Sequence, residues 1–191
     1  PIVVAMATIC LFNTNPVKAA DPMTTTTPSP ENTINLYTTY GRVVIELFPD
    51  VAPKHVEQIK TLTRKGFYDG IVFHRVIEGF MAQTGDPTGT GTGGSDLPNI
   101  PAEFNNKNFG RGAVGMARSA SPDSGNSQFF ICFDDCSFLN GQYTVWGQVT
   151  SGMEFVDKIK RGEPPVTPDK IVKMTVAADE GKTAEPKAVA K

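Results

Sequence analysis

The chain has 191 residues, 39% of them hydrophobic, and a formal net charge of −2. This length fits one domain with appended segments, and the hydrophobic fraction is enough for a single core. The acidic balance and the lack of a Lys/Arg run exclude nucleic acid as a favoured partner. The 18 Gly and 15 Pro predict many turns, and therefore short strands rather than long helices.

The first residues form a short apolar segment. Residues 2–12 are almost wholly apolar, and small residues follow at Ala19 and Ala20. A bilayer span takes about 20 apolar residues, so no membrane span is expected, whereas the segment resembles the hydrophobic part of a secretory signal peptide. Because the chain starts without Met or a basic stretch, we expect residues 1–20 to be a signal peptide that lacks its beginning. This predicts export, most simply to a periplasm; the alternative is a core strand in a cytoplasmic protein.

The remaining chain divides into a linker, a domain and a tail. Residues 21–33 are rich in Thr and Pro, which predicts a disordered linker. The folded domain is expected at 34–177. Residues 178–191 carry Ala, Lys and Glu with little to bury, which predicts a disordered tail.

Within the domain, apolar and polar residues alternate at 34–36 and 43–47, and six further short apolar segments bring the number of predicted strands to eight. They are expected near 34–36, 43–47, 71–76, 80–84, 113–118, 128–133, 144–149 and 171–176. One helix is predicted after Pro53, where apolar residues recur at helical spacing, and a second over Met153 to Ile159. Eight strands can close a sheet so that no edge stays exposed. The predicted fold is all-β with two helices: a closed eight-stranded antiparallel β-barrel capped by a helix at each end.

The central stretch, residues 73–94, is the best candidate for a functional site. A chain reversal at Glu78-Gly79 would form a hairpin that brings Arg75 beside Gln83. In a strand alternate side chains share a face, so Met81 points with Gln83. The pattern predicts an apolar floor with a guanidinium and a carboxamide at its edge, and it supplies no obvious nucleophile.

Several motifs follow one another in a distinctive order. They are Phe73-His74-Arg75-Val76-Ile77, the run 79–86 (Gly-Phe-Met-Ala-Gln-Thr-Gly-Asp), Gly91-Thr92-Gly93-Gly94, Glu103-Phe104, Gly115-Met116-Ala117, Ser127-Gln128-Phe129-Phe130-Ile131 and Leu139-Asn140-Gly141. From about Ile34 to Val176 the chain therefore resembles the cyclophilin-type peptidyl-prolyl cis-trans isomerases, and bacterial members in particular. The resemblance implies an eight-stranded barrel with two helices, rotation about X-Pro bonds, and proline-containing unfolded or exposed segments as partners. It implies no cofactor and no metal.

The resemblance also implies roles for individual residues. Arg75 would be the catalytic cation and Gln83 its polar partner. The proline pocket and the segment that pairs with the substrate backbone would be formed by Phe80, Met81, Ala117, Arg118, Phe130, Phe138, Leu139 and Tyr143. Phe138 stands where the best-known eukaryotic pattern has Trp, and Tyr143 where it has His. Since Phe138 lacks an indole N–H, weak cyclosporin binding is expected.

Some of these residues also fit other functions. The run Gly89 to Gly94 matches a dinucleotide-binding fingerprint, but the Pro-containing segment after it cannot be the required helix. His74, Asp86 and Ser124 could be assembled into a hydrolase triad, although a structural His74 is favoured and no nucleophile-elbow motif occurs. Arg75 could instead make a surface ion pair.

The cysteines and the activity itself also leave alternatives. Cys132 and Cys136 lack the spacing of a zinc site and are expected to be ordinary thiols, with a bridge between them as the alternative. The rival to an isomerase is a module on the same fold that binds proline-containing peptides without turning them over.

Overall fold

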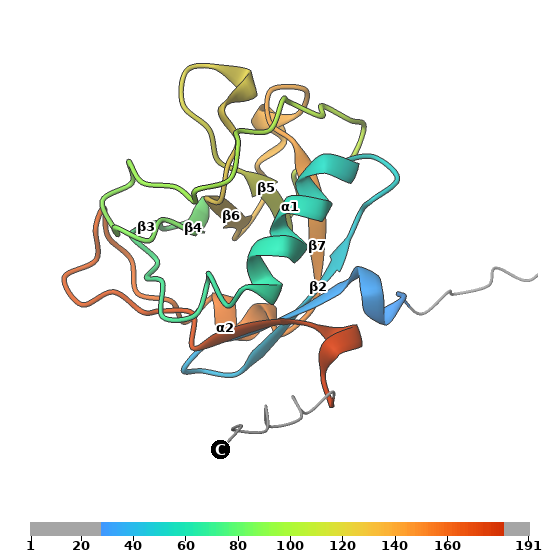
Figure 1. Cartoon of the computed structure of the whole chain (residues 1–191). Coiled ribbons are helices and arrows are strands. Elements are labelled where there is room, and N and C mark those ends of the chain that lie inside the picture. Colours follow the sequence, from blue (N-terminus) through green and yellow to red (C-terminus); the bar gives the residue numbers. More distant parts are fainter. Residues whose placement is uncertain (1–27, 182–191) are drawn as a thin grey trace, which may run out of the picture.

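The computed structural model describes residues 28–181 (Figure 1). The predicted signal peptide, Cys10, residues 21–27 of the predicted linker and residues 182–191 of the predicted tail lie outside this part. The strands are β1 Thr33–Tyr37, β2 Arg42–Leu47, β3 Arg75–Ile77, β4 Met81–Thr84, β5 Ala113–Met116, β6 Phe129–Cys132, β7 Val145–Ser151 and β8 Lys173–Val176. The helices are α1 Pro53–Arg64 and α2 Met153–Val156, with short 3-10 turns η1 Pro30–Asn32, η2 Pro122–Ser124, η3 Ser137–Leu139 and η4 Ala177–Asp179.

All eight strands belong to one curled antiparallel sheet. Their order is β3-β4-β6-β5-β7-β2-β1-β8, and each neighbouring pair in this order is antiparallel. Figure 1 shows β1 in blue beside β8 in red, which joins the two ends of the domain. No ladder joins β3 to β8, so the predicted full closure is not confirmed. Only an isolated bridge between Val72 and Lys170 and neighbouring backbone bonds connect the two edges.

The alternating pattern is explained by one buried face. In β1 and β2 the side chains of Ile34, Leu36, Val43 and Ile45 are fully buried in the main core. Helix α1 adds Val56, Ile59 and Leu62 to the same core, as their spacing predicts. Trp146, the only Trp of the chain, is buried there too.

A second, smaller core lies on the other face of β4 and β6. Met81, Phe130 and Leu139 belong to it, whereas Ala82, Phe129 and Ile131 point into the main core. Successive residues of a strand face opposite sides, so each of these strands contributes to both cores. This second core forms the support of the candidate site.

Several strand and helix boundaries differ from the sequence-based expectations. β3 begins at Arg75 rather than at Ile71, because the backbone of 70–73 bonds instead to that of 169–171. α2 is a single turn that ends at Val156. Short 3-10 turns, η1 and η4, lie at the two ends of the described part of the chain.

Specific contacts hold these two ends. Glu31, within the predicted linker, accepts hydrogen bonds from Lys60 and Arg64 of α1. Glu180, within the predicted tail, accepts bonds from Tyr37 and Thr175. These contacts attach the residues on either side of 34–177 to the rest of the fold.

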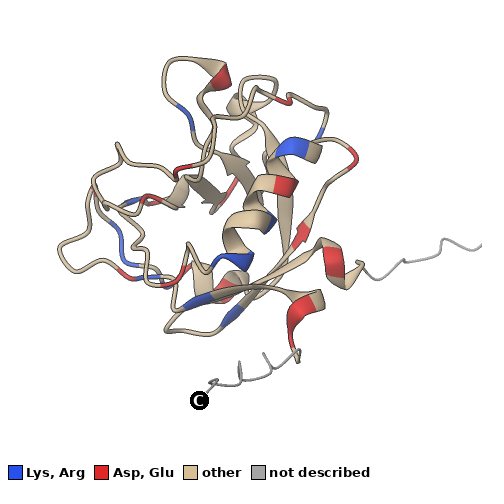
Figure 2. Cartoon of the chain, in the orientation of Figure 1, with Lys and Arg blue, Asp and Glu red and all other residues tan. Residues whose placement is uncertain are grey.

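Charges of both signs are interspersed along the described chain (Figure 2). None of the helices within residues 28–181 is long and apolar enough to cross a bilayer.

Candidate active site

The candidate site is built on the β3–β4 hairpin. In its register Arg75 lies opposite Gln83, and Ile77 lies opposite Met81. The turn is possible because Gly79 adopts a φ of 70°, which a side chain disfavours. The predicted hairpin and the predicted Arg–Gln pair are thus both present.

A cavity of about 230 Å³ opens beside this hairpin. Nine of the ten residues predicted for the site line it: Arg75, Phe80, Met81, Gln83, Ala117, Arg118, Phe130, Leu139 and Tyr143. Met81 and Phe130 form its buried floor, and β4 and β6 hold them in adjacent strands with Gln83 opposite Phe130. Residues far apart in the sequence therefore meet around a small apolar hollow that two arginines, Arg75 and Arg118, border.

Phe138 is the predicted residue that does not line the cavity. Its side chain is 61% exposed and contacts Phe80, with ring centroids 5.4 Å apart. It extends the apolar rim rather than the floor. The Arg118 guanidinium lies 4.4 Å from the centroid of the Tyr143 ring and donates to the Gln142 carbonyl.

A polar chain fixes Gln83. Its Nε2 donates to Oε1 of Gln128 at 2.9 Å, and Gln128 Nε2 donates to the carbonyls of Gly91 and Gly93. Asp86 fastens the same glycine-rich loop by accepting bonds from Thr88 and from the Gly91 and Gly93 amides. Burial alone would raise the pKa of Asp86, but these bonds bring it to about 2. The glycine-rich loop lines a second, more polar cavity of about 620 Å³. This cavity shares Gln83 with the smaller cavity at the hairpin.

The hydrolase alternative is not supported by the arrangement of its residues. Among the described residues, no hydrogen bond links His74, Asp86 and Ser124, and Ser124 donates instead to the Ser121 carbonyl. His74 is buried, and burial lowers the pKa of its imidazole. The His74 ring packs against the glycine-rich loop, so closely that a Cβ atom added to Gly91 would lie 3.7 Å from Nε2 of His74. His74 does not line the cavity at the hairpin. His74 therefore takes no part in a triad, and both of its buried ring nitrogens lack a hydrogen-bond partner among the described residues.

The structure adds a residue that the motifs did not indicate. Oε2 of Glu163, which lies 88 positions after Arg75, accepts a hydrogen bond of 2.8 Å from the Arg75 Nε. The surface ion pair that the sequence left open as an alternative for Arg75 is therefore present. Arg75 also lines the cavity, so the ion pair and a role at the cavity are compatible. No local sequence pattern joins these two positions.

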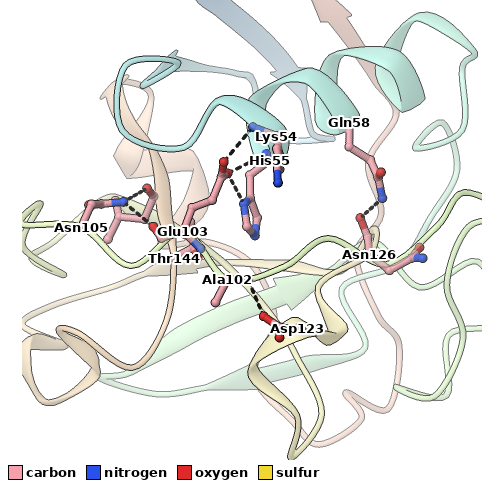
Figure 3. A network of polar contacts seen from close by, with 10 residues as sticks. Lys54, His55, Gln58, Ala102, Glu103, Asn105, Asp123, Asn126 and Thr144 are labelled. Atoms are coloured by element: carbon pink, nitrogen blue, oxygen red, sulfur yellow. Dashed lines mark hydrogen bonds and ion pairs between the residues drawn. The ribbon is translucent and has the colours of Figure 1, made fainter.

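A buried network behind the site was also missed. Glu103 accepts bonds from the backbone amides of Lys54 and His55 and from Nδ1 of His55 at 2.6 Å (Figure 3). It replaces the side-chain cap that Ala52 cannot supply at the start of α1. Figure 3 also shows Gln58 bonded to Asn126, which ties α1 to the loop before β6. The Ala102 amide donates to Asp123 and so ties two loops to each other. The only sequence signal for this network was the Glu103-Phe104 motif, which does not indicate the residues that Glu103 contacts.

The arrangement matches a known family over most of the chain. The family model for the cyclophilin type peptidyl-prolyl cis-trans isomerase/CLD matches residues 33–176. This chain belongs to the cyclophilin-type peptidyl-prolyl cis-trans isomerases. Its reaction class is therefore rotation about X-Pro peptide bonds, as the motifs predicted.

Relatives and solved structures agree with this family. A Brucella suis protein named "Probable peptidyl-prolyl cis-trans isomerase" is 55% identical over 172 residues, which cover 82% of this chain and 88% of the relative. A Helicobacter pylori peptidyl-prolyl cis-trans isomerase is 47% identical over 129 residues, 66% of this chain and 78% of its own.

Among solved structures, a cyclophilin from Hirschia baltica aligns with a TM-score of 0.74 at 31% identity, covering 84% of this chain and 77% of its own. A Cryptosporidium parvum cyclophilin determined in the presence of the dipeptide Ala-Pro gives a TM-score of 0.70 at 29% identity, covering 75% of this chain and 98% of its own.

Proposed function

We propose that this cyclophilin isomerises X-Pro bonds by holding the proline ring in the cavity at the β3–β4 hairpin while Arg75 stabilises the twisted amide. The observation that carries the proposal is the cavity beside the β3–β4 hairpin, in which an apolar floor of Met81 and Phe130 meets the guanidinium of Arg75. An apolar floor suits the proline ring, which has no polar group of its own. The polar edge suits the amide beside it.

The barrier to rotation comes from amide resonance and amounts to about 18–20 kcal/mol. In the twisted state this resonance is lost, and the proline nitrogen becomes pyramidal and basic. An N–H donor beside that nitrogen then forms a much stronger hydrogen bond than in the planar ground state, which is the differential binding that catalysis requires. No bond is made or broken, so the step needs no proton donor or nucleophile.

Arg75 suits this role better than a lysine would. Its planar guanidinium stays charged and carries several N–H donors in a fixed geometry. One of them, at Nε, bonds to Glu163, while the side chain still lines the cavity. Gln83, opposite Arg75 and held by Gln128, is placed to orient the substrate carbonyl.

The proposal is tested with Arg75→Ala and NMR exchange measurements on a short X-Pro peptide. We expect turnover to fall at least about a hundredfold, equivalent to roughly 2.7 kcal/mol of transition-state stabilisation. Peptide affinity should change far less. An equal fall in affinity and turnover would mean that Arg75 only binds the peptide, and unchanged turnover would refute its catalytic role.

The rival activity is a module that binds proline-containing peptides without isomerising them. Wild-type protein that leaves the exchange rate at its uncatalysed value while binding the same peptide would support this alternative. The presence of Arg75 and Gln83 at the cavity favours the enzyme.

We also propose four narrower properties: the clients, the location, the closure of the sheet and the affinity for cyclosporin. The clients are proline-containing unfolded or exposed segments of exported proteins, and the protein acts in a periplasm; the apolar residues 2–12 support export. Mass spectrometry of the mature N-terminus tests this location, since a cytoplasmic protein would keep the apolar segment.

The sheet functions as a closed barrel capped by its helices. The backbone hydrogen bonds between 70–73 and 169–171 support this closure. Cyclosporin binding is weak because Phe138 offers no N–H donor.

A further inference from the structure

The guanidinium of Arg75 is held by one partner. Its Nε donates to Glu163 at 2.8 Å, and this is the one hydrogen bond of the side chain within residues 28–181. Arg75 and Glu163 are 42% and 53% exposed, respectively. A surface pair of this kind contributes only about 0–1 kcal/mol to stability. Its importance must therefore be sought in geometry rather than in the free energy of unfolding.

The backbone explains why Glu163 reaches Arg75. Gly162 and Val76 exchange two backbone hydrogen bonds of 2.8 Å in an antiparallel bridge. One step further along such a pair, residue 163 lies opposite residue 75, and directly opposite side chains share a face. Figure 1 shows the orange loop after α2 running beside β3. Arg75 thus stands between Gln83 on β4 and Glu163 on this loop.

The single bond at Nε constrains the direction of the guanidinium. With Nε held on the loop side, the planar group cannot rotate freely about the end of its side chain. Its two terminal nitrogens make no hydrogen bond to another residue of the described chain, and the side chain borders the cavity. These donors are therefore available to a bound peptide.

We propose that Glu163 is a positioning residue for the isomerase reaction: it orients the Arg75 guanidinium so that its terminal N–H groups face the proline nitrogen. This inference rests on the catalytic role proposed for Arg75. Glu163 itself is not expected to touch the substrate.

The test compares Glu163→Ala, Glu163→Gln and Arg75→Ala in NMR exchange and steady-state measurements on one X-Pro peptide. We expect Glu163→Ala to lower kcat about five- to tenfold with KM unchanged, below the roughly hundredfold cost of a full 1 Å misplacement. Glu163→Gln keeps an acceptor oxygen at the same reach, so its kcat should stay within about twofold of wild type.

A spectroscopic readout separates positioning from a general structural effect. The Nε–H signal of Arg75, assigned by its loss in Arg75→Lys, should broaden or disappear in Glu163→Ala because the freed proton exchanges faster with water. Glu78→Ala is the matched control: it removes a similar exposed ion pair, to Arg161, from the neighbouring hairpin turn. The control should leave both kcat and the Arg75 signal unchanged.

The outcomes distinguish the two proposals. The inference is overturned if Glu163→Ala keeps kcat within about 1.5-fold of wild type, if its Arg75 signal is unaltered, or if Glu163→Gln loses as much activity as Glu163→Ala. If Arg75→Ala retains activity, the proposed role of Arg75 fails first. A hundredfold loss in Arg75→Ala beside an unaffected Glu163→Ala would remove only the positioning role.

Discussion

Substitution of Glu103 by Ala should destabilise the fold strongly, because one carboxylate serves three donors. It accepts from the Lys54 and His55 amides and from Nδ1 of His55. Loss of an N-terminal helix cap costs about 0.5–2 kcal/mol. The His55 ring, only 2% exposed, would lose its partner, and an unsatisfied buried polar group costs about 1–3 kcal/mol.

Together these losses predict a decrease of roughly 2–4 kcal/mol in the free energy of unfolding, a large part of the 5–15 kcal/mol typical of a domain. Urea titration followed by Trp146 fluorescence measures it, since this single Trp is buried in the main core. For a domain of this size the same loss lowers Tm by about 4–16 °C.

Two variants sharpen the measurement. Glu57→Ala removes an exposed carboxylate from the same helix and should change the free energy of unfolding by less than about 0.5 kcal/mol. Glu103→Gln retains an acceptor oxygen and should fall between wild type and Glu103→Ala. If Glu103→Ala lost less than about 1 kcal/mol, the idea that Glu103 caps α1 and satisfies His55 would be refuted.

Three further predictions concern acid, thiols and cyclosporin. Burial lowers the pKa of His55 below 6.5, and hydrogen bonds bring the pKa of Glu103 below 4.5 although its burial opposes this, so the unfolded state binds more protons. The free energy of unfolding should therefore fall as pH drops below about 6.5 and again below about 4.5 in urea titrations; a flat profile would contradict this. Burial raises the pKa of the free Cys132 and Cys136 thiols, so a thiol-specific reagent should label them only in denaturant, and rapid labelling of native protein would argue against their burial. Phe138→Trp should tighten cyclosporin binding about three- to tenfold in calorimetry through the added N–H donor, and an unchanged Kd would dismiss that donor as the cause.

Local patterns predicted the secondary structure where one face of an element is buried. The alternation of Ile34, Leu36, Val43 and Ile45 predicted β1 and β2, and the helical spacing after Pro53 predicted α1. The strand near 71–76 was misplaced for a physical reason. Ile71 and Phe73 are buried, as in a strand, but their backbone partners lie about 100 positions later, in 169–171.

The family motifs predicted which residues meet at the cavity, but not their supporting contacts. The sequence by itself determined the family, the β3–β4 hairpin and the chemical types at the site, because these depend on short-range spacing and side-chain identity. Only the tertiary structure decided that Phe138 lies at the rim, that Glu163 holds Arg75 and that Glu103 caps α1. Each of these depends on segments that the curled sheet brings together from distant parts of the chain, and such pairings leave no periodicity in a single sequence.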